Sequence, residues 1–479
     1  MTRRRVVLYN PKAVFYTMPL GLLAVGSHLD PSRYEVVIVD GRLEDDPPAA
    51  VVAALGGGPD GAAGEAVALG VSVLTGAPIR DAVEVSRAAK ARFPHLPVVW
   101  GGWHPSLFPD ACLAEPSVDV TVQAQGEETF AEILERIEKR RSLEGCPGCS
   151  HRQEGGKPRV EAPRPLAPVS ELAPHDYSLL PVERYFALKG KRQLDYITSQ
   201  GCFFRCAFCA DPFVYNRKWV GLSPGRVGEE LGRLHRLHGF TDVNFQDETF
   251  FTYLDRVAGI AEELTRRRLP STWAATMRAD QGDRLTDDVW AACKRSGLRR
   301  VLIGVEAGTQ EMVDRIRKDI RLEQVIRCAE RCLHHGIAAQ FPFIVCFPGE
   351  SDASVAATLD FARRLAAMSP AFQTPVFFFK PYPGTPLTEE AVRNGYRPPA
   401  TLDDWARFDF YESDSPWVTP ERARLVTRFR WYERRAYDAA PSWKRPLTAL
   451  ARWRCERSAF GFPVEKLLGD IFFPEPVLS

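Results

Sequence analysis

The chain has 479 residues and nearly balanced charge, with 62 Lys and Arg against 61 Asp and Glu and a formal net charge of +1. Hydrophobic residues make up 45% and charged residues 26%, which is typical of a folded globular protein rather than a disordered one. This length exceeds one ordinary core, so we expect about two to three domains. A near-neutral chain does not gather polynucleotides by its overall field, so a nucleic-acid substrate is disfavoured.

The sequence also disfavours a membrane location. No apolar stretch approaches the roughly 20 residues that a membrane-spanning helix needs. The apolar run Val6–Tyr9 is too short for the core of a signal peptide, and a first buried strand is the better interpretation. We therefore expect a cytoplasmic protein whose eleven cysteines are thiols or metal ligands rather than disulfides.

Residues 1–140 alternate short apolar runs with helical segments, which is typical of a Rossmann-like, doubly wound parallel sheet. The expected strands are Val6–Tyr9, Val36–Val39, Val67–Leu74 and Val98–Trp100, and the expected helices are Leu20–Leu29 and Ile79–Phe93. Ligands of such folds bind at the carboxyl ends of the strands. No G-x-G-x-x-G motif follows the first strand, which argues against a dinucleotide.

The remainder of the chain divides into three parts. Residues 141–190 are rich in Gly, Pro and charge and are expected to form a turn-rich linker. Residues 191–400 resume the alternation and predict a six-stranded partial barrel, whose chemistry would lie at the carboxyl ends of its strands. The strands are expected at Leu194–Thr198, Val243–Phe245, Ser271–Ala275, Arg300–Gly304, Ala339–Val345 and Pro375–Phe379. Residues 401–479 are expected to be helical.

The strongest motif is a group of three cysteines, Cys202, Cys206 and Cys209, on a loop after the first barrel strand. Iron–sulfur clusters favour soft thiolate ligands, and three of them on one loop can bind a single cluster. A four-iron cluster held by three thiolates keeps one iron open for another ligand. By contrast, Cys146 and Cys149 lie in a Pro-Gly turn without the four ligands of a structural zinc site, so we interpret them as incidental thiols.

This C-x3-C-x2-C motif resembles that of the radical S-adenosylmethionine (SAM) superfamily, and the resemblance extends to the strand ends that follow. It implies a four-iron, four-sulfur cluster on the three cysteines, with SAM as a second cofactor. It places Asp247 and Glu248 at the amino group of SAM, Arg278 beside the cofactor, and Glu306 at the cofactor's ribose or at the base of the site. Phe208 matches the aromatic residue that is usual before the third cysteine. Two acids facing one ammonium group would be favourable electrostatics.

The first domain resembles the cobalamin-binding domain of radical SAM enzymes, which implies cobalamin as a third cofactor. The residues expected at this cofactor are Pro19, Ser72, Leu74, Thr75, Gly101, Gly102, His104, Gly126 and Glu127. The Asp-x-His-x-x-Gly motif that supplies a cobalt ligand in mutases is absent. We therefore expect cobalt without a histidine from the protein, and His104 in the pocket for the cofactor's tail.

The sequence departs from the family pattern at Ala307, which stands where the family has Ser, and at four positions in or near the two cofactor-binding loops. Gln200 and Phe203 stand where relatives commonly have Arg and Pro. Ala124 and Gln125 stand where relatives usually have Gly and Glu. None of these positions is a cluster ligand. Ala124 and Gln125, however, weaken the match of the segment around Gly126 and Glu127 to the cobalamin-binding pattern.

The resemblance implies that the reduced cluster passes one electron to SAM, and that the 5'-deoxyadenosyl radical so formed takes a hydrogen atom from the substrate. With methylcobalamin nearby, the first expectation is methylation of an unactivated carbon in a small molecule or peptide. An electron donor such as flavodoxin or ferredoxin would be the protein partner. The main alternative is an oxidative cyclase or ring-rearranging enzyme that uses cobalamin.

Two other functions are less favoured. A tRNA methylthiotransferase would need cysteines for a second cluster in its first domain, where only Cys112 lies within the doubly wound part. A non-catalytic cobalamin sensor would not need the three-cysteine loop.

Overall fold

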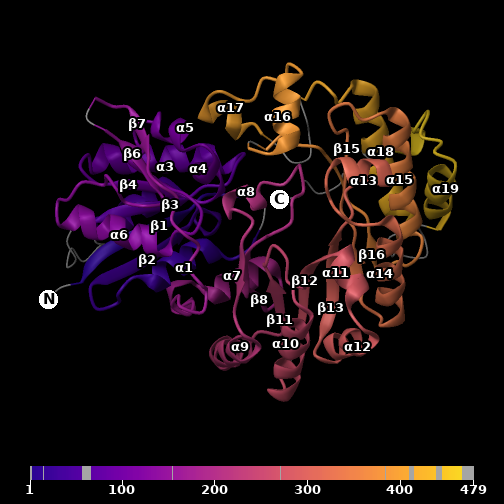
Figure 1. The fold of residues 1–479 in the computed structure, drawn as a ribbon, viewed down its shortest axis with the longest axis horizontal. Helices are drawn as coiled ribbons and strands as arrows, with labels where there is room; N and C mark the ends of the chain where they lie inside the picture. The colour runs from indigo at the N-terminus through magenta and orange to yellow at the C-terminus, as the bar shows by residue number, and fades with distance from the viewer. Residues whose placement is uncertain are drawn as a thin grey trace.

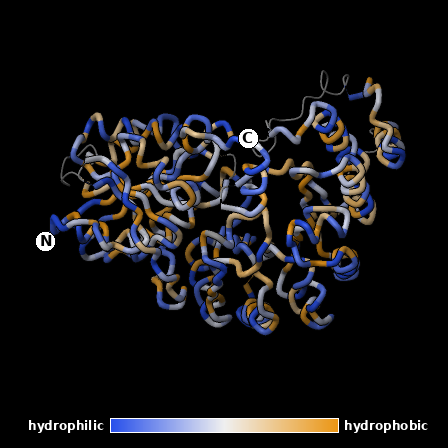
Figure 2. Tube along the Cα trace, turned by 45° about the horizontal axis from the view of Figure 1, so that its top comes forward, coloured by the Kyte–Doolittle hydropathy of each residue, from blue (hydrophilic) through white to orange (hydrophobic). Residues whose placement is uncertain are grey.

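The computed structural model describes residues 3–13, 16–56, 66–153, 155–269, 271–382, 384–408, 415–437 and 445–466. They form a first α/β domain, a second domain built on a curved parallel sheet, and a helical C-terminal region (Figure 1). Along the outer helices in Figure 2 hydrophobic and hydrophilic residues alternate, as expected for helices with one buried face. Within these ranges, no helix combines the length and the apolar character that crossing a membrane requires.

The first domain confirms the predicted doubly wound sheet. Its seven strands lie in the order β2-β1-β3-β4-β5-β6-β7, and β1 to β5 are parallel. The strands are β1 Arg4–Asn10, β2 Tyr34–Asp40, β3 Ala68–Ser72, β4 Val98–Gly101, β5 Val120–Val122, β6 Cys149–Arg152 and β7 Pro158–Val160. The helices are α1 Leu20–His28, α2 Pro47–Leu55, α3 Pro78–Arg92, α4 Trp103–Leu107, α5 Pro109–Leu113 and α6 Glu127–Glu138. One core packs α2, α3 and α5 against the sheet, and a second core packs α1 and α6 against its other face.

The segment 141–190 is a linker only in its second part, which corrects the expectation for its beginning. Strands β6 and β7 extend the first sheet in antiparallel fashion, with Val122 opposite Cys149. Strands of three or four residues between Gly and Pro show too little alternation to be recognised in the sequence. Cys146 and Cys149 are fully buried in the core of this domain, Cys146 in the turn that precedes β6 and Cys149 as the first residue of that strand. A short helix, α7 Val182–Lys189, then leads into the second domain.

The second domain confirms the predicted six-stranded partial barrel. Its parallel sheet has the order β16-β14-β13-β12-β11-β8. The strands are β8 Gln193–Tyr196, β11 Asp242–Phe245, β12 Thr272–Arg278, β13 Leu298–Gly304, β14 Ala338–Gln340 and β16 Phe372–Gln373. The surrounding helices are α9 Pro224–His238, α10 Leu254–Arg266, α11 Ala279–Arg284, α12 Asp287–Arg295, α13 Gln310–Arg315, α14 Leu322–His334, α15 Asp352–Ala366 and α16 Pro386–Arg393.

The last two barrel strands differ from the expected bounds. The expected strand Ala339–Val345 is divided into β14 and β15 Phe343–Val345, and Pro342 lies between them. The expected strand Pro375–Phe379 corresponds to β17 Val376–Phe378, whereas β16, which pairs with β14, precedes it and was not expected, with Pro375 between the two. Proline has no N–H to donate to a neighbouring strand, so the ladder breaks at both positions. The carbonyl of Pro342 instead accepts from the N–H groups of Val305 and Glu306 at 3.2 and 3.1 Å.

The C-terminal region is helical as predicted, but it does not form a separate unit. Helices α18 Pro420–Tyr437 and α19 Arg445–Glu456 share the core of the barrel. Helix α17 Leu402–Ala406 instead returns to the first domain, where Trp405 is buried in the core that also contains α3 (Figure 1). The C-terminal part of the chain therefore packs against both domains.

Candidate active site

The three cysteines of the motif lie on one loop, which follows β9 Ser199–Gly201. This strand pairs in antiparallel fashion with β10 Trp219–Gly221. Gly201 has a φ of 88°, and a Cβ there would lie 2.2 Å from the carbonyl oxygen of Lys218, so only glycine fits before Cys202. The loop is anchored where the N–H of Ala207 donates to the carbonyl of Ile316 at 2.8 Å. We name residues 202–209 the cluster loop.

The thiols of the cluster loop suit an iron–sulfur cluster. Cys206 is buried, and Cys202 and Cys209 are half-buried. Burial raises the pKa of the Cys202 thiol to about 11, so iron must displace a proton from it on binding. Three soft donors on one rigid loop, partly open to an adjoining space, match what such a cluster needs.

Arg278, which the family resemblance places beside the cofactor, lies against the cluster loop. Its Nη1 atom donates to the sulfur of Cys206 at 3.5 Å, and its guanidinium lies 3.6 Å from the ring centroid of Phe204. Its Nε atom donates to Asp280 at 2.9 Å. A fixed positive charge beside a cluster sulfur stabilises negative charge on that cluster.

Glu306 is already paired, with a lysine that also lies close to Phe208 of the cluster loop. The Nζ atom of Lys318 donates to its carboxylate at 2.8 Å, and both side chains are buried. Lys318 also lies 5.9 Å from the ring of Phe208. Nothing in the sequence around Lys318 indicated this role, because lysines on loops are common.

The two acids that were expected to face one ammonium group have different hydrogen-bond partners. The buried Asp247 carboxylate accepts from the N–H and hydroxyl of Thr198 at 2.8 and 2.5 Å and from the Ser199 hydroxyl at 2.5 Å. It therefore stabilises the end of the first barrel strand. Glu248 accepts from the N–H of Gly201 at 3.2 Å and lines a cavity. Burial, with nearby Asp211, raises the pKa of Glu248 to about 8.

That cavity, of about 340 Å³, lies between the two domains and is lined by residues of both. Six of the nine residues expected at cobalamin line it, together with Glu248 from the barrel. They are Ser72, Leu74, Gly101, Gly102, Gly126 and Glu127. Gly102 has a φ of 95°, and a Cβ there would lie 3.0 Å from the backbone nitrogen of Val73. Glycine at this position therefore lets the end of β4 pack closely against the end of β3, beside a cavity at the carboxyl ends of the strands, where ligands of doubly wound folds bind.

The other three residues expected at cobalamin are not among the residues that line the cavity. Pro19 precedes α1, between the lining residues Met18 and Leu20. Thr75 Oγ1 and His104 Nδ1 lie 3.2 Å apart in a hydrogen bond, and both residues are buried. His104 packs against Trp405, with ring centroids 5.8 Å apart, and burial lowers its pKa to about 4.

One histidine that sequence reasoning missed, His175, does line the cavity. It lies in the proline-rich part of the linker, where no motif pointed to it. Burial lowers its pKa to about 4, so its imidazole is neutral near pH 7.

Two of the departures from the family pattern meet in the structure. The side-chain amide of Gln125 donates to the amide oxygen of Gln200 at 2.7 Å, and that of Gln200 donates to Glu127 at 3.4 Å. The Gln125 oxygen also accepts from the N–H of Ala167 at 2.8 Å. A neutral amide bridge therefore links the Gly126 loop of the first domain to the strand before the cluster loop.

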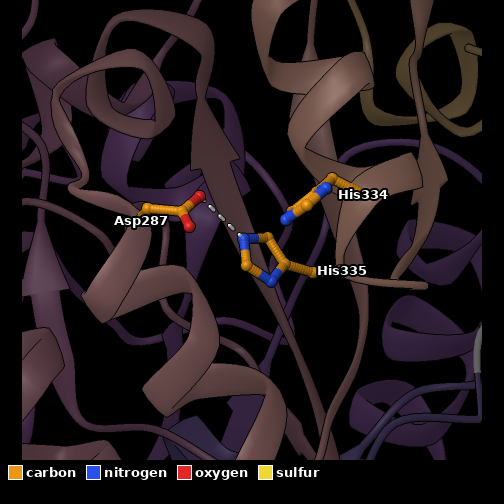
Figure 3. Close-up of side chains that lie close together, drawn as sticks. All are labelled: Asp287, His334 and His335. Carbon is orange, nitrogen blue, oxygen red and sulfur yellow. Dashed lines mark hydrogen bonds and ion pairs between the residues drawn. The ribbon is translucent and has the colours of Figure 1, made fainter.

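Asp287, His334 and His335 form a further group of residues that can ligate metals, with ligand atoms within 4.8 Å of one another (Figure 3). The Asp287 carboxylate is already engaged, because Arg331 forms an ion pair with it and His335 Nε2 lies 3.2 Å away. A metal ion would have to displace the guanidinium, so we assign no metal to this group.

A three-cysteine loop after the first strand of a partial barrel, in a chain whose doubly wound first domain shares a cavity with that barrel, defines a radical SAM enzyme with a cobalamin domain. The family model of the Radical SAM superfamily matches residues 196–362, and that of the B12 binding domain matches residues 7–134. The uncharacterized methyltransferase PH0819 of Pyrococcus horikoshii is 32% identical over 407 residues, covering 83% of this chain and 84% of that protein.

Two further similarities agree with this assignment. The cytidylyl-2-hydroxyethylphosphonate methyltransferase of Streptomyces wedmorensis is 25% identical over 468 residues, covering 83% of this chain and 84% of that protein. The solved structure of the radical SAM methyltransferase TsrM from Kitasatospora setae has the same fold, with a TM-score of 0.72 at 18% identity and coverage of 94% and 95% of the two chains. The chain belongs to the radical SAM superfamily, among the members that carry a B12 binding domain. Its cofactors are a four-iron, four-sulfur cluster, SAM and cobalamin.

Replacing any one cysteine of the cluster loop should abolish cluster binding. After anaerobic reconstitution, iron analysis should give about four irons per chain for the parent protein. We expect less than about one for Cys202→Ala, Cys206→Ala or Cys209→Ala, because two thiolates do not retain the cluster. Cys146→Ala is the matched control, since this buried thiol lies in the first domain. Equal iron loss in the control would show that the ligands are wrongly assigned.

Cobalamin should bind without a nitrogen ligand from the protein. Electron paramagnetic resonance of the cob(II)alamin form reports an axial nitrogen as superhyperfine splitting. We expect identical spectra for the parent protein, His104→Ala and His175→Ala, because His104 faces the core and His175 belongs to no ligand motif. Splitting that disappears in either variant would identify that histidine as the cobalt ligand.

Proposed function

We propose that this enzyme methylates an unactivated carbon of a small molecule or peptide. The observation that carries the proposal is the interdomain cavity, into which Glu248 of the barrel and the strand ends of the first domain both open. Bound at these places, the cluster with SAM supplies radical chemistry, and cobalamin supplies a methyl group. The names of the two relatives described above, both methyltransferases, support the same reaction.

The polar residues at this site have separate tasks in the proposal. Glu248 holds the amino group of SAM, while Asp247 holds the strand end from which Glu248 projects. With a pKa of about 8, Glu248 is largely protonated at neutral pH, and an ammonium group beside it favours the ionised form. SAM binding therefore releases a proton, and the affinity for SAM should rise as pH increases toward 8.

The apolar lining of the cavity protects the reaction. Leu74, Val99 and Ile197 are among its lining residues and come from both domains. Excluding water from this space prevents the quenching of reactive species and strengthens the electrostatic contacts of Glu248. The substrate would occupy the part of the cavity between the cluster loop and the first domain.

The proposal includes the cellular setting. The enzyme would act in the cytoplasm and receive electrons from a small carrier protein such as flavodoxin or ferredoxin. It would not act on nucleic acid, which agrees with a formal net charge of only +1.

Glu248→Gln should weaken SAM binding, whereas Asp247→Asn should mainly destabilise the fold. A hydrogen bond to a charged group contributes about 1.5–3 kcal/mol, so the Kd for SAM should rise about tenfold or more in Glu248→Gln. Asp247→Asn should change this Kd by less than about threefold and lower the Tm, because its partners are Thr198 and Ser199. Calorimetric titration of the cluster-loaded enzyme and thermal melting test both statements. Equal weakening of SAM binding by the two variants would instead support the expectation that both acids hold the amino group of SAM.

The products should show whether a methyl group is transferred. With reductant and the true substrate, we expect 5'-deoxyadenosine and S-adenosylhomocysteine in similar amounts, because one SAM generates the radical and another recharges cobalamin. Chromatography with mass detection measures both. If 5'-deoxyadenosine formed with substrate while S-adenosylhomocysteine did not, a cyclase or rearrangement would replace methylation.

A further inference from the structure

Four exposed cations surround the cluster loop. Arg205 lies within the loop, and its side chain is 58% exposed. Arg217 is exposed and donates to the carbonyl of Phe203 in the loop at 3.2 Å. Lys218 is exposed, and its backbone lies against Gly201, directly before Cys202. Arg317 is exposed and follows Ile316, the residue that anchors the loop. We name Arg205, Arg217, Lys218 and Arg317 the cluster-edge patch.

The patch has an excess of positive charge. Asp319 pairs with Arg205 through two hydrogen bonds of 2.7 and 2.9 Å. In the described part of the chain, no carboxylate lies within ion-pair distance of Arg217, Lys218 or Arg317. Four cations and one anion leave a local charge of +3, on a chain whose formal net charge is +1. The patch is therefore a local feature and does not follow from an overall basic composition.

From this arrangement we infer that the cluster-edge patch is the docking surface for an acidic one-electron carrier protein of the flavodoxin type. The inference rests on the proposed function, which requires electrons to reach the cluster loop. Electron transfer weakens steeply with distance, so the carrier must dock where the loop meets solvent. Encounters of this kind use small interfaces, and complementary charge raises their association rate.

The step itself is balanced without any bond change. One electron leaves the anionic flavin hydroquinone, which becomes the neutral semiquinone, and enters the cluster. No proton, ligand or leaving group moves. The patch residues act only by orienting the carrier, whose docking face would carry carboxylates opposite these cations.

The charge-reversal variant Lys218→Glu/Arg317→Glu tests the inference with little risk to the loop. In the described structure neither side chain takes part in a hydrogen bond or ion pair that supports the cluster loop. The matched control is Arg268→Glu/Arg295→Glu, which makes the same change in charge. Arg268 and Arg295 are exposed and precede β12 and β13, at the amino ends of the barrel strands. Arg268 also matches Arg317 in backbone conformation, with φ values of 50° and 53°.

The first measurement is the Kd of the reconstituted enzyme for an oxidised acidic flavodoxin, at low and physiological ionic strength. We expect the patch variant to raise the Kd about tenfold at low salt and to flatten its salt dependence, because exposed charges are screened. The control should change the Kd by less than about twofold. The neutral variant Lys218→Gln/Arg317→Gln should give an intermediate Kd. An unchanged Kd in the patch variant, or an equal change in the control, would overturn the inference.

The second measurement is SAM cleavage driven either by reduced flavodoxin or by dithionite. At a flavodoxin concentration below the Kd, the rate of SAM cleavage by the patch variant should fall by about the same factor as its affinity for flavodoxin. The dithionite-driven rate should stay unchanged. Equal loss with both reductants would overturn the inference, since it would indicate damage to the loop itself. Failure of the proposed function is distinguishable, because it would appear as 5'-deoxyadenosine without S-adenosylhomocysteine in every variant, while the binding measurement still reports on docking.

Discussion

The buried carboxylate of Asp195 holds the two domains in the relation on which the site depends. It is fully buried on β8, accepts from the N–H of Met18 at 2.8 Å and from Gln246 Nε2 at 3.1 Å, and forms an ion pair with Lys189. Removing a charge from water is costly unless every partner is present, so this arrangement tolerates little displacement of one domain against the other. Met18 and Gln246 both line the interdomain cavity. The same interaction that joins the domains thus shapes the space in which two cofactors must face one substrate.

Such a fixed geometry is what the chemistry requires. A reaction that uses reactive species from two cofactors gains most of its rate and its selectivity from holding the reacting groups at short distance without water. The chain fixes this geometry through close contacts between backbone segments rather than through many polar side chains. Gly102 and Gly201 permit approaches that any Cβ would block, and Asp247 holds the end of the first barrel strand beneath Glu248.

The connection between the domains continues beyond Asp195. Gln125 and Gln200, which depart from the pattern expected from the family resemblance, form a neutral bridge at the edge of the cavity. A pair of amides has less desolvation to overcome than an ion pair in the same place, so both departures together can preserve the contact. Helix α17 adds a second connection, because Trp405 packs into the core of the first domain and against His104.

The sequence by itself determined the elements whose signal is local. The spacing of Cys202, Cys206 and Cys209, the doubly wound first domain and the six-stranded barrel all follow from short motifs and from periodicity along the chain. Only the tertiary structure decided which side chains meet. It turned Asp247 toward Thr198, paired Glu306 with Lys318, placed His104 in a core and brought His175 to the cavity. The physical reason is that such partners are distant in sequence, as Met18 and Asp195 are at 177 residues, and no local pattern encodes a contact over that separation.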